Sequence, residues 1–292
     1  MPVFPTPEPI DLAINLQVGD IDVIATDRTD TVVTVTPSSP NKAADLRGAE
    51  ATRVEFDGAR LTVIGPKPKF GLMSLIGPSE SVDVTVELPA GSRFTAESAV
   101  GGVRTEGRLA ATRIKATTGT VDLDTTGDLW LRAGHGNATA RSIDGSAEIT
   151  ADHGRIRIES VAGDAVLKAS HGSIGVGETL GGVEANLSYG DLDIDRAVGS
   201  VAAKTAYGAI TLGEVSGGVI DLESSYGKLT VGVAEGVPAW LDLSSKEGRV
   251  RNHLDERLPE AATGDHVAEP IGDHVTVRAR AKFGDIDIRR AR

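Results

Sequence analysis

The strongest constraint on the fold of this chain is a repeated dipeptide. Between residues 118 and 227 a His, Tyr or Thr is followed by glycine at steps of 17 to 19 residues. A fixed short period is typical of a solenoid, whose units bury their apolar faces only by stacking on their neighbours. The repeat therefore predicts a stack of short coils. The dipeptides are Thr118-Gly119, His135-Gly136, His153-Gly154, His171-Gly172, Tyr189-Gly190, Tyr207-Gly208 and Tyr226-Gly227.

The residues between these glycines indicate at least two strands per coil. Apolar residues follow each glycine at the second and fourth positions, as at Leu192 and Ile194, with polar residues between them. This is the period of a strand with one buried face. A second glycine series, half a period out of phase, precedes another alternating run. Glycine suits such corners because it reaches positive φ without steric cost. The second series is Gly127, Gly145, Gly163, Gly181, Gly199, Gly217 and Gly236.

One competing architecture also has 18 residues per coil, the left-handed hexapeptide helix. It needs an inward aliphatic residue at every sixth position, but stepping from Ile174 gives Leu180 and then Asn186. We therefore predict an all-β fold, a single-stranded parallel β-solenoid (β-helix) with irregular capping ends. Coils of about 18 residues and a right-handed crossover are expected.

The continuous repeat predicts a single β-solenoid domain over residues 1–292. Residues 1–90 are expected to hold N-terminal strands and a cap loop, 91–251 the regular coils, and 252–292 an insertion and a closing coil. The ends of a solenoid expose unpaired strand edges, so the irregular ends are expected to cap it against edge-to-edge association.

Composition limits the partners and the compartment. A formal net charge of −12 disfavours binding to nucleic acid, and the absence of cysteine excludes disulfides and thiolate metal sites. No apolar run approaches the ~20 residues of a transmembrane helix, so no integral membrane segment is expected. The opening residues MPVFPTPEPI lack the basic and apolar regions of a secretory signal. A cytoplasmic location is the default expectation, although a chain whose leader had been removed would look the same.

The column formed by His135, His153 and His171 is the sharpest candidate for chemistry. Equivalent residues of neighbouring coils lie ~4.8 Å apart, and zinc binds imidazole nitrogen at ~2.0–2.1 Å, so two of these rings are candidates to share a metal ion. A straight column does not make a tetrahedral set, however, and the column continues as tyrosines, which indicates flat rings that stack. We favour a structural ladder at or inside a corner and keep a metal site as the alternative. The ladder comprises Tyr189, Tyr207 and Tyr226 with Gly136, Gly154, Gly172, Gly190, Gly208 and Gly227.

Acidic pairs also recur. Paired carboxylates can bind calcium or act as acid and base, but the coils around Asp193 carry Gly175 and Thr211 at the equivalent position. We therefore predict that these residues are outward and solvated. The pairs are Asp20/Asp22, Asp122/Asp124, Asp191/Asp193 and Asp285/Asp287.

A loop over residues 66–80 is unusually apolar for a segment rich in Pro and Gly. It is either a tip that docks a partner or a segment that folds back over the first coils; we favour the cap and keep docking open. The apolar residues are Phe70, Leu72, Met73, Leu75 and Ile76.

Several blocks of this sequence resemble a known group. SVDVTVELPAGSRF, SAVGGVRTEG, the repeated Tyr-Gly-x-Leu-x-Ile and the final VTVRARAKFGDIDIRRA are similar to a bacterial β-strand-repeat family of "putative adhesins" of unknown function, and to its actinobacterial branch in particular. The likeness runs from about Ile14 to Arg292. It implies a parallel β-solenoid and supplies no catalytic residues, whereas the adhesin label implies export.

These observations together predict a non-enzymatic scaffold without a cofactor, which binds a protein partner or a second copy of itself. An adhesin-like surface or glycan-binding protein is the alternative. An enzyme acting on polysaccharides is disfavoured, because no carboxylates gather in one predicted groove beside exposed rings.

Overall fold

The computed structural model describes residues 1–66, 80–254 and 274–291. It contains two compact units, Met1–Gly163 and Asp164–Arg292, which we call the N-terminal and C-terminal units. The boundary falls within the regular repeat, and the single domain expected from that repeat stays a prediction. Both units are built almost entirely of strands, most of them parallel, as the sequence predicts.

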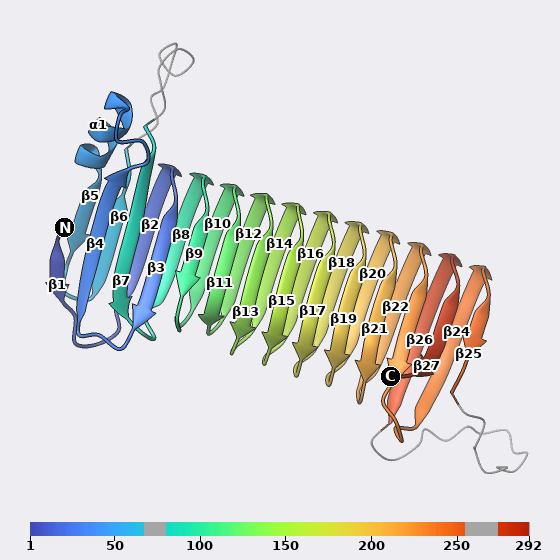
Figure 1. Ribbon diagram of the computed structural model, residues 1–292. Helices are drawn as coiled ribbons and strands as arrows, with labels where there is room; N and C mark the ends of the chain where they lie inside the picture. Colours follow the sequence, from blue (N-terminus) through green and yellow to red (C-terminus); the bar gives the residue numbers. More distant parts are fainter. Residues whose placement is uncertain (67–79, 255–273, 292) are drawn as a thin grey trace, which may run out of the picture. The chain divides into compact units, whose positions relative to one another are not determined.

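In the N-terminal unit the strands form two sheets (Figure 1). The first has the order β1-β4-β7-β3-β9-β11-β13-β15, and the second has the order β5-β6-β2-β8-β10-β12-β14. The strands are β1 (Val3–Pro5), β2 (Asp11–Val18), β3 (Ile21–Thr26), β4 (Asp30–Pro37), β5 (Arg53–Phe56), β6 (Arg60–Ile64), β7 (Val82–Pro89), β8 (Arg93–Val100), β9 (Val103–Glu106), β10 (Thr112–Thr118), β11 (Val121–Thr126), β12 (Leu129–His135), β13 (Ala138–Ile143), β14 (Ala147–His153) and β15 (Ile156–Val161).

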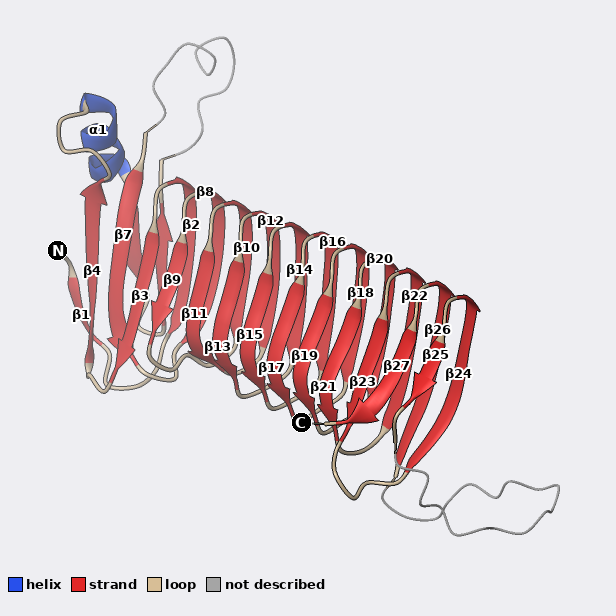
Figure 2. Ribbon diagram, turned by 45° about the vertical axis from the view of Figure 1, so that its right-hand side comes forward, coloured by secondary structure: helices blue, strands red, loops and turns tan. Residues whose placement is uncertain are grey.

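The start of the N-terminal unit departs from simple stacking. Strand β2 lies between β6 and β8, and β3 lies between β7 and β9, so the earliest coil of the chain is not the outermost one. Antiparallel pairs β1–β4, β4–β7 and β5–β6 form the outer edge. A helix that the sequence did not predict, α1 (Ala43–Ala51), contacts β4 and β7 (Figure 2). These elements interrupt the open parallel edge that would otherwise present unpaired backbone groups.

The C-terminal unit also has two sheets, with the orders β17-β19-β21-β23-β27-β25 and β16-β18-β20-β22-β26-β24. Regular partners lie 18 residues apart, as in the pairing of Val183 with Val201. The strands are β16 (Ala165–His171), β17 (Ile174–Thr179), β18 (Val183–Tyr189), β19 (Leu192–Ala197), β20 (Val201–Tyr207), β21 (Ile210–Val215), β22 (Val219–Tyr226), β23 (Leu229–Val233), β24 (Ala239–Glu247), β25 (Val250–Asn252), β26 (Val275–Phe283) and β27 (Ile286–Arg290).

The last strands of the C-terminal unit do not close it. Strand β26 pairs with β22 on one side and β24 on the other, and β27 lies between β23 and β25. The sequence predicted a closing coil within residues 252–292, but the earlier strands β24 and β25 take the outermost position. Apolar residues alternate with polar ones along β26, and the apolar side chains of Val275, Val277 and Ala279 are all buried. This pattern fits a strand that has neighbours on both sides.

The core follows the predicted alternation. In β18 the side chains of Val183, Ala185 and Leu187 are buried, and in β19 those of Leu192 and Ile194 are buried. Complete burial of one large aliphatic side chain stabilises a fold by about 1.5–3 kcal/mol. The strand faces predicted from the sequence are therefore confirmed.

The two glycine series differ in backbone conformation. Gly190 has a φ of 134°, and a Cβ there would lie 2.0 Å from the carbonyl oxygen of Gly172. The other glycines of the ladder share the positive φ: 138° at Gly136, 136° at Gly154, 147° at Gly172, 150° at Gly208 and 159° at Gly227.

In the second glycine series only Gly236 has a positive φ. Positive φ, the reason given above for glycine at the corners, therefore applies to only one member of this series. At Gly199 the reason for glycine is close approach, because a Cβ would lie 2.4 Å from the carbonyl oxygen of Gly181.

Candidate functional site

The ring residues of the C-terminal unit form one continuous stack, which we call the ring ladder: His171, Tyr189, Tyr207, Tyr226 and Phe283. Successive ring centroids lie 4.8–5.0 Å apart, and neighbouring planes differ by only 2–6°. This spacing is that of paired strands, so each coil supplies one ring and the strand register aligns them. Phe283 was not predicted as a member, although the Phe283-Gly284 dipeptide carries the same signal.

The ring ladder is a surface feature. The exposed fractions are 49% for Tyr189 and 46% for both Tyr207 and Tyr226. Strand parity predicted that these rings lie at or inside the corner, and the inward placement is wrong. Leu187 is the last buried side chain of β18, and the alternation ends before the turn at Gly190. Stacked rings cover much of one another's faces, so ring edges and hydroxyl groups are what the ladder presents to a partner.

The three candidate metal ligands lie in similar stacks. In the N-terminal unit the rings of His135 and His153 lie 4.7 Å apart with planes 3° from parallel, and in the C-terminal unit His171 stacks on Tyr189. Imidazole lone pairs lie in the plane of the ring, so stacked rings do not direct them at a shared ion. Among the described residues no three His, Cys, Asp or Glu side chains are grouped to hold a metal ion.

Several corner residues accept hydrogen bonds from the backbone of a neighbouring coil. The Oδ1 of Asp191 accepts a 2.7 Å hydrogen bond from the N–H of Ala209, and the Oδ1 of Asn137 accepts one of 3.0 Å from Arg155. The same relationship recurs at other corners. Further acceptor–donor pairs are Asp20 with Gly102, Asp128 with Ser146, Asp164 with Gly182 and Asp285 with Arg249.

The second member of an acidic pair has a different environment. Burial raises the pKa of Asp193, and the nearby carboxylates of Asp191 and Asp195 raise it further. A hydrogen bond from Thr211 acts in the opposite direction and lowers this pKa. Burial likewise raises the pKa of Asp22. Among the first members of the pairs, Asp20, Asp191 and Asp285 accept hydrogen bonds from backbone N–H groups. Among the second members, Asp22, Asp124 and Asp287 are half-buried, whereas Asp193 is exposed, as is Asp122. Simple solvation therefore describes only some of these carboxylates.

The outer face of the first sheet in the N-terminal unit contains a hollow of about 580 Å³. It has acidic and basic residues but no aromatic ring among its lining residues. Within it Arg104 pairs with Glu106 at 3.3 Å. The charged lining residues are Arg104, Glu106, Asp122, Asp124, Arg141 and Glu159.

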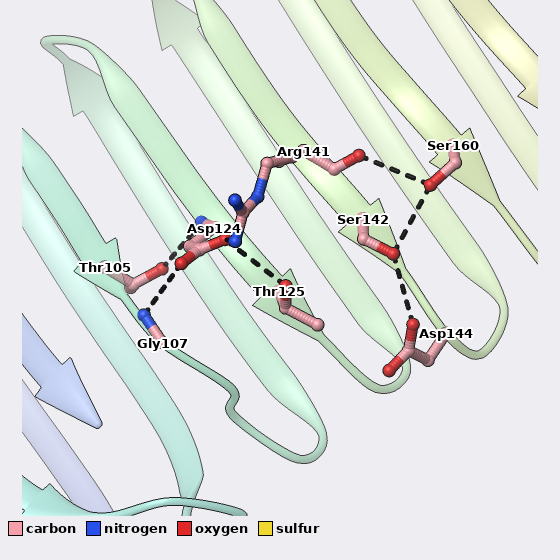
Figure 3. A network of polar contacts seen from close by, with 8 residues as sticks. All are labelled: Thr105, Gly107, Asp124, Thr125, Arg141, Ser142, Asp144 and Ser160. Carbon is pink, nitrogen blue, oxygen red and sulfur yellow. Dashed lines mark hydrogen bonds and ion pairs between the residues drawn. The ribbon is translucent and has the colours of Figure 1, made fainter. Parts of the chain in front are cut away.

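Asp124 is the centre of the polar network in this hollow (Figure 3). Its Oδ2 accepts a 2.9 Å hydrogen bond from the N–H of Gly107, and its Oδ1 accepts one of 3.3 Å from Thr125. The guanidinium of Arg141 forms an ion pair with the same carboxylate. The Asp124 N–H donates to the Oγ1 of Thr105 at 3.2 Å. A carboxylate with this many partners is held as a structural link between coils, not as a free acid or base.

The expected docking residues Phe70, Leu72, Met73, Leu75 and Ile76 lie outside the described residues. Among the residues that are described, no helix has the length and apolar character needed to cross a membrane.

A family model described as Toastrack DUF4097 matches residues 10–238. A search of curated proteins finds no match. The family match supports the resemblance to an adhesin-like repeat family that the sequence blocks suggested.

Solved structures similar to this chain include two described as a "putative adhesin". One, from Bacteroides fragilis, is 17% identical with a TM-score of 0.49 and covers 80% of this chain and 95% of its own. The other, from Parabacteroides merdae, is 14% identical with a TM-score of 0.44 and covers 80% and 94%. A "putative lipid binding protein" from Parabacteroides distasonis is 10% identical with a TM-score of 0.37 and covers 97% and 95%. Likeness at this level gives no ground for assigning a function.

Proposed function

Because the chain belongs to the Toastrack DUF4097 family, we propose that it is a non-enzymatic β-solenoid scaffold that binds a protein partner or a second copy of itself. The observation that carries this proposal is the ring ladder. Its three tyrosines are nearly half exposed although each is fixed by ring neighbours on both sides. Exposed aromatic residues are enriched at protein interfaces, and rings held in place lose little conformational freedom on binding.

The absence of enzyme activity is part of the proposal. Two of the four carboxylates that line the hollow of the N-terminal unit are paired with arginines, Asp124 with Arg141 and Glu106 with Arg104. A general acid needs a pKa raised towards the working pH, whereas a nearby guanidinium favours the charged carboxylate. These two pairings speak against the polysaccharide-acting enzyme that the sequence already disfavoured.

An adhesin-like surface or glycan-binding role is the second candidate. The observation that favours it is a separate hollow in the C-terminal unit with several basic side chains, described in the next subsection. The cytoplasmic location, the right-handed crossover, the coil length and the actinobacterial branch expected from the sequence also stay predictions. Cell fractionation tests the cytoplasmic location.

Affinity purification of the tagged full-length chain from its native cells, with mass spectrometry, tests the scaffold role. The informative variant is Tyr207→Ser with Tyr226→Ser, which removes two adjacent rings from the ladder. The matched control is Trp240→Ser, because Trp240 is an exposed aromatic residue (37%) of the same unit outside the ladder. We expect the double variant to lose at least one partner, or the self-association seen by light scattering, while the control keeps it. Equal capture by all three proteins would exclude the ladder as the docking surface.

A further inference from the structure

The outer face of the second sheet in the C-terminal unit contains a hollow of about 440 Å³. Small side chains, Ala206 of β20 and Ser225 of β22, are among the residues that line it. The strand register continues this row through Lys282 of β26 to Lys246 of β24. The hollow is therefore an open groove across neighbouring strands, with two lysines at one end.

The charge of this hollow is opposite to that of the chain. Lys204 pairs with Glu223 at 3.1 Å, and Arg280 pairs with the carboxylate of Asp242. Lys246 and Lys282 also line the hollow and belong to none of the ion pairs among the described residues. Two exposed positive charges thus stand side by side, without an ion-pair partner, in a protein whose formal net charge is −12.

Neutral hydrogen-bonding groups line the rest of the hollow. The hydroxyl groups of Ser225 and Ser244 and the amide of Asn186 border it. Hydroxyl and amide groups both donate and accept hydrogen bonds, which suits a ligand covered with hydroxyl groups.

The ring ladder beside this row narrows the choice of ligand. Tyr207 and Tyr226 directly follow Ala206 and Ser225 in their strands, but their rings are stacked 4.9 Å apart. Proteins that bind single-stranded nucleic acid stack bases on free aromatic faces, and here each of these two rings has a ring neighbour on both sides. Recognition at this surface therefore depends on charge and hydrogen bonds.

We propose that the hollow binds an acidic polysaccharide. A carboxylate or sulfate group of the ligand lies between the ammonium groups of Lys246 and Lys282, and sugar hydroxyls bond to Ser225, Ser244 and Asn186. The polysaccharide chain runs across the strands. This site supplies a ligand class for the second candidate function and does not depend on the protein contact at the ring ladder.

Fluorescence anisotropy of the full-length protein with labelled probes tests this site. The probes are dextran sulfate, polygalacturonate and uncharged dextran, which separate sulfate from carboxylate recognition. We expect one or both acidic probes to bind, with an affinity that falls as salt is added, and dextran not to bind. Lys246→Ser with Lys282→Ser should weaken binding by about tenfold, the effect of losing two exposed ion pairs. Ser225→Trp, which fills the hollow without changing charge, should also weaken it.

The matched control is Lys115→Ser with Arg132→Ser. Lys115 and Arg132 are likewise exposed register partners on adjacent strands, but they lie in the N-terminal unit outside this hollow. This control should keep its affinity within about twofold. If both double variants weaken binding equally, or if an oligothymidylate binds as tightly as the acidic polysaccharides, the binding is non-specific electrostatic attraction. Either result would overturn the proposal. Failure of every acidic probe would also overturn it, while partner capture at the ring ladder would remain a separate result.

Discussion

The N–H of Ala209 donates a 2.7 Å hydrogen bond to the Oδ1 of Asp191, which lies 18 residues earlier in the chain. Asn137 accepts in the same way from Arg155, and Asp164 from Gly182, each at the same sequence separation. These side chains extend the backbone ladder into the corners, where backbone N–H groups would otherwise depend on water. A short polar residue after a corner glycine is thus a device that fixes coil register.

Replacing Asp191 should reveal the value of one such corner bond. Asp191→Ala should lower the free energy of unfolding by about 0.5–1.5 kcal/mol, the net contribution of a typical hydrogen bond. Asp191→Asn keeps a carbonyl oxygen as acceptor and should lose less. Urea unfolding of both variants measures the difference, and equal losses would show that the bond to Ala209 contributes little.

The glycines of the ladder should tolerate no side chain. Gly190→Ala should cost about 1–3 kcal/mol from its positive φ alone, and more because the Cβ would meet the oxygen of Gly172. Gly175→Ala is the control, since nothing lies within 4 Å of its Cβ position and its φ is not positive. Its unfolding free energy should change by less than about 0.5 kcal/mol. Thermal or urea unfolding compares the two.

The middle of the ring ladder should contribute more than its end. Tyr207 stacks on two rings, so Tyr207→Ala should cost about 1–3 kcal/mol at about 0.5–1.5 kcal/mol per aromatic pair. Among the described residues Phe283 stacks only on Tyr226, so Phe283→Ala should lose roughly half as much stacking. Tyr207→Phe should stay close to the parent. A larger loss at Phe283 than at Tyr207 would contradict this account.

Acid should weaken the outer coil of the C-terminal unit. The hydrogen bond from the N–H of Arg249 lowers the pKa of Asp285, and Arg251 and Lys228 act in the same direction. A carboxyl whose pKa is lower in the folded state stabilises the fold above its unfolded pKa of about 3.9, and this contribution disappears as the pH falls through the lower folded pKa. The urea midpoint, measured from neutral pH to below the folded pKa of Asp285, should fall less steeply for Asp285→Asn than for the parent protein. Parallel curves for the two proteins would show that this carboxyl does not cause the loss of stability in acid.

A destabilising substitution in β26 should also destabilise β24, the outermost strand of the same sheet. Val277 is completely buried and pairs with both Ile220 of β22 and Leu241 of β24. Val277→Asp places a charge in the core, so hydrogen exchange should rise in β24 as well as in β26. Thr276→Asp is the control, because Thr276 points outward in the same strand. If β24 keeps its protection in Val277→Asp, it does not depend on β26 for its stability.

The sequence was most informative about features set by alternation within one strand. Val183, Ala185 and Leu187 were predicted to face inward because the hydrophobic period alone decides the face of a strand. The exposure of Tyr189 depends instead on where the alternation stops before the turn at Gly190, and hydrophobic pattern does not encode that position.

Stacking of equivalent rings in neighbouring coils was predicted because those rings repeat in the sequence, but other contacts between coils were beyond sequence reasoning. The bond from Ala209 to Asp191 and the hollow above Ala206 arise only when neighbouring coils are in register. The place of β26 was also unpredictable, because its alternation fits any coil of the stack. Helix α1 was missed because nine residues with little amphipathic pattern give a weak signal.

The position of β26 and β27 has a consequence for biosynthesis. Residues 239–252 leave the ribosome before residues 275–290, yet their strands pair only with those later strands. While the chain grows, the places beside β22 and β23 are free, and the strands available to take them are β24 and β25. If β24 and β25 pair there first, β26 and β27 must displace them to reach the final strand order. A solenoid that simply adds one coil after another has no such replacement step.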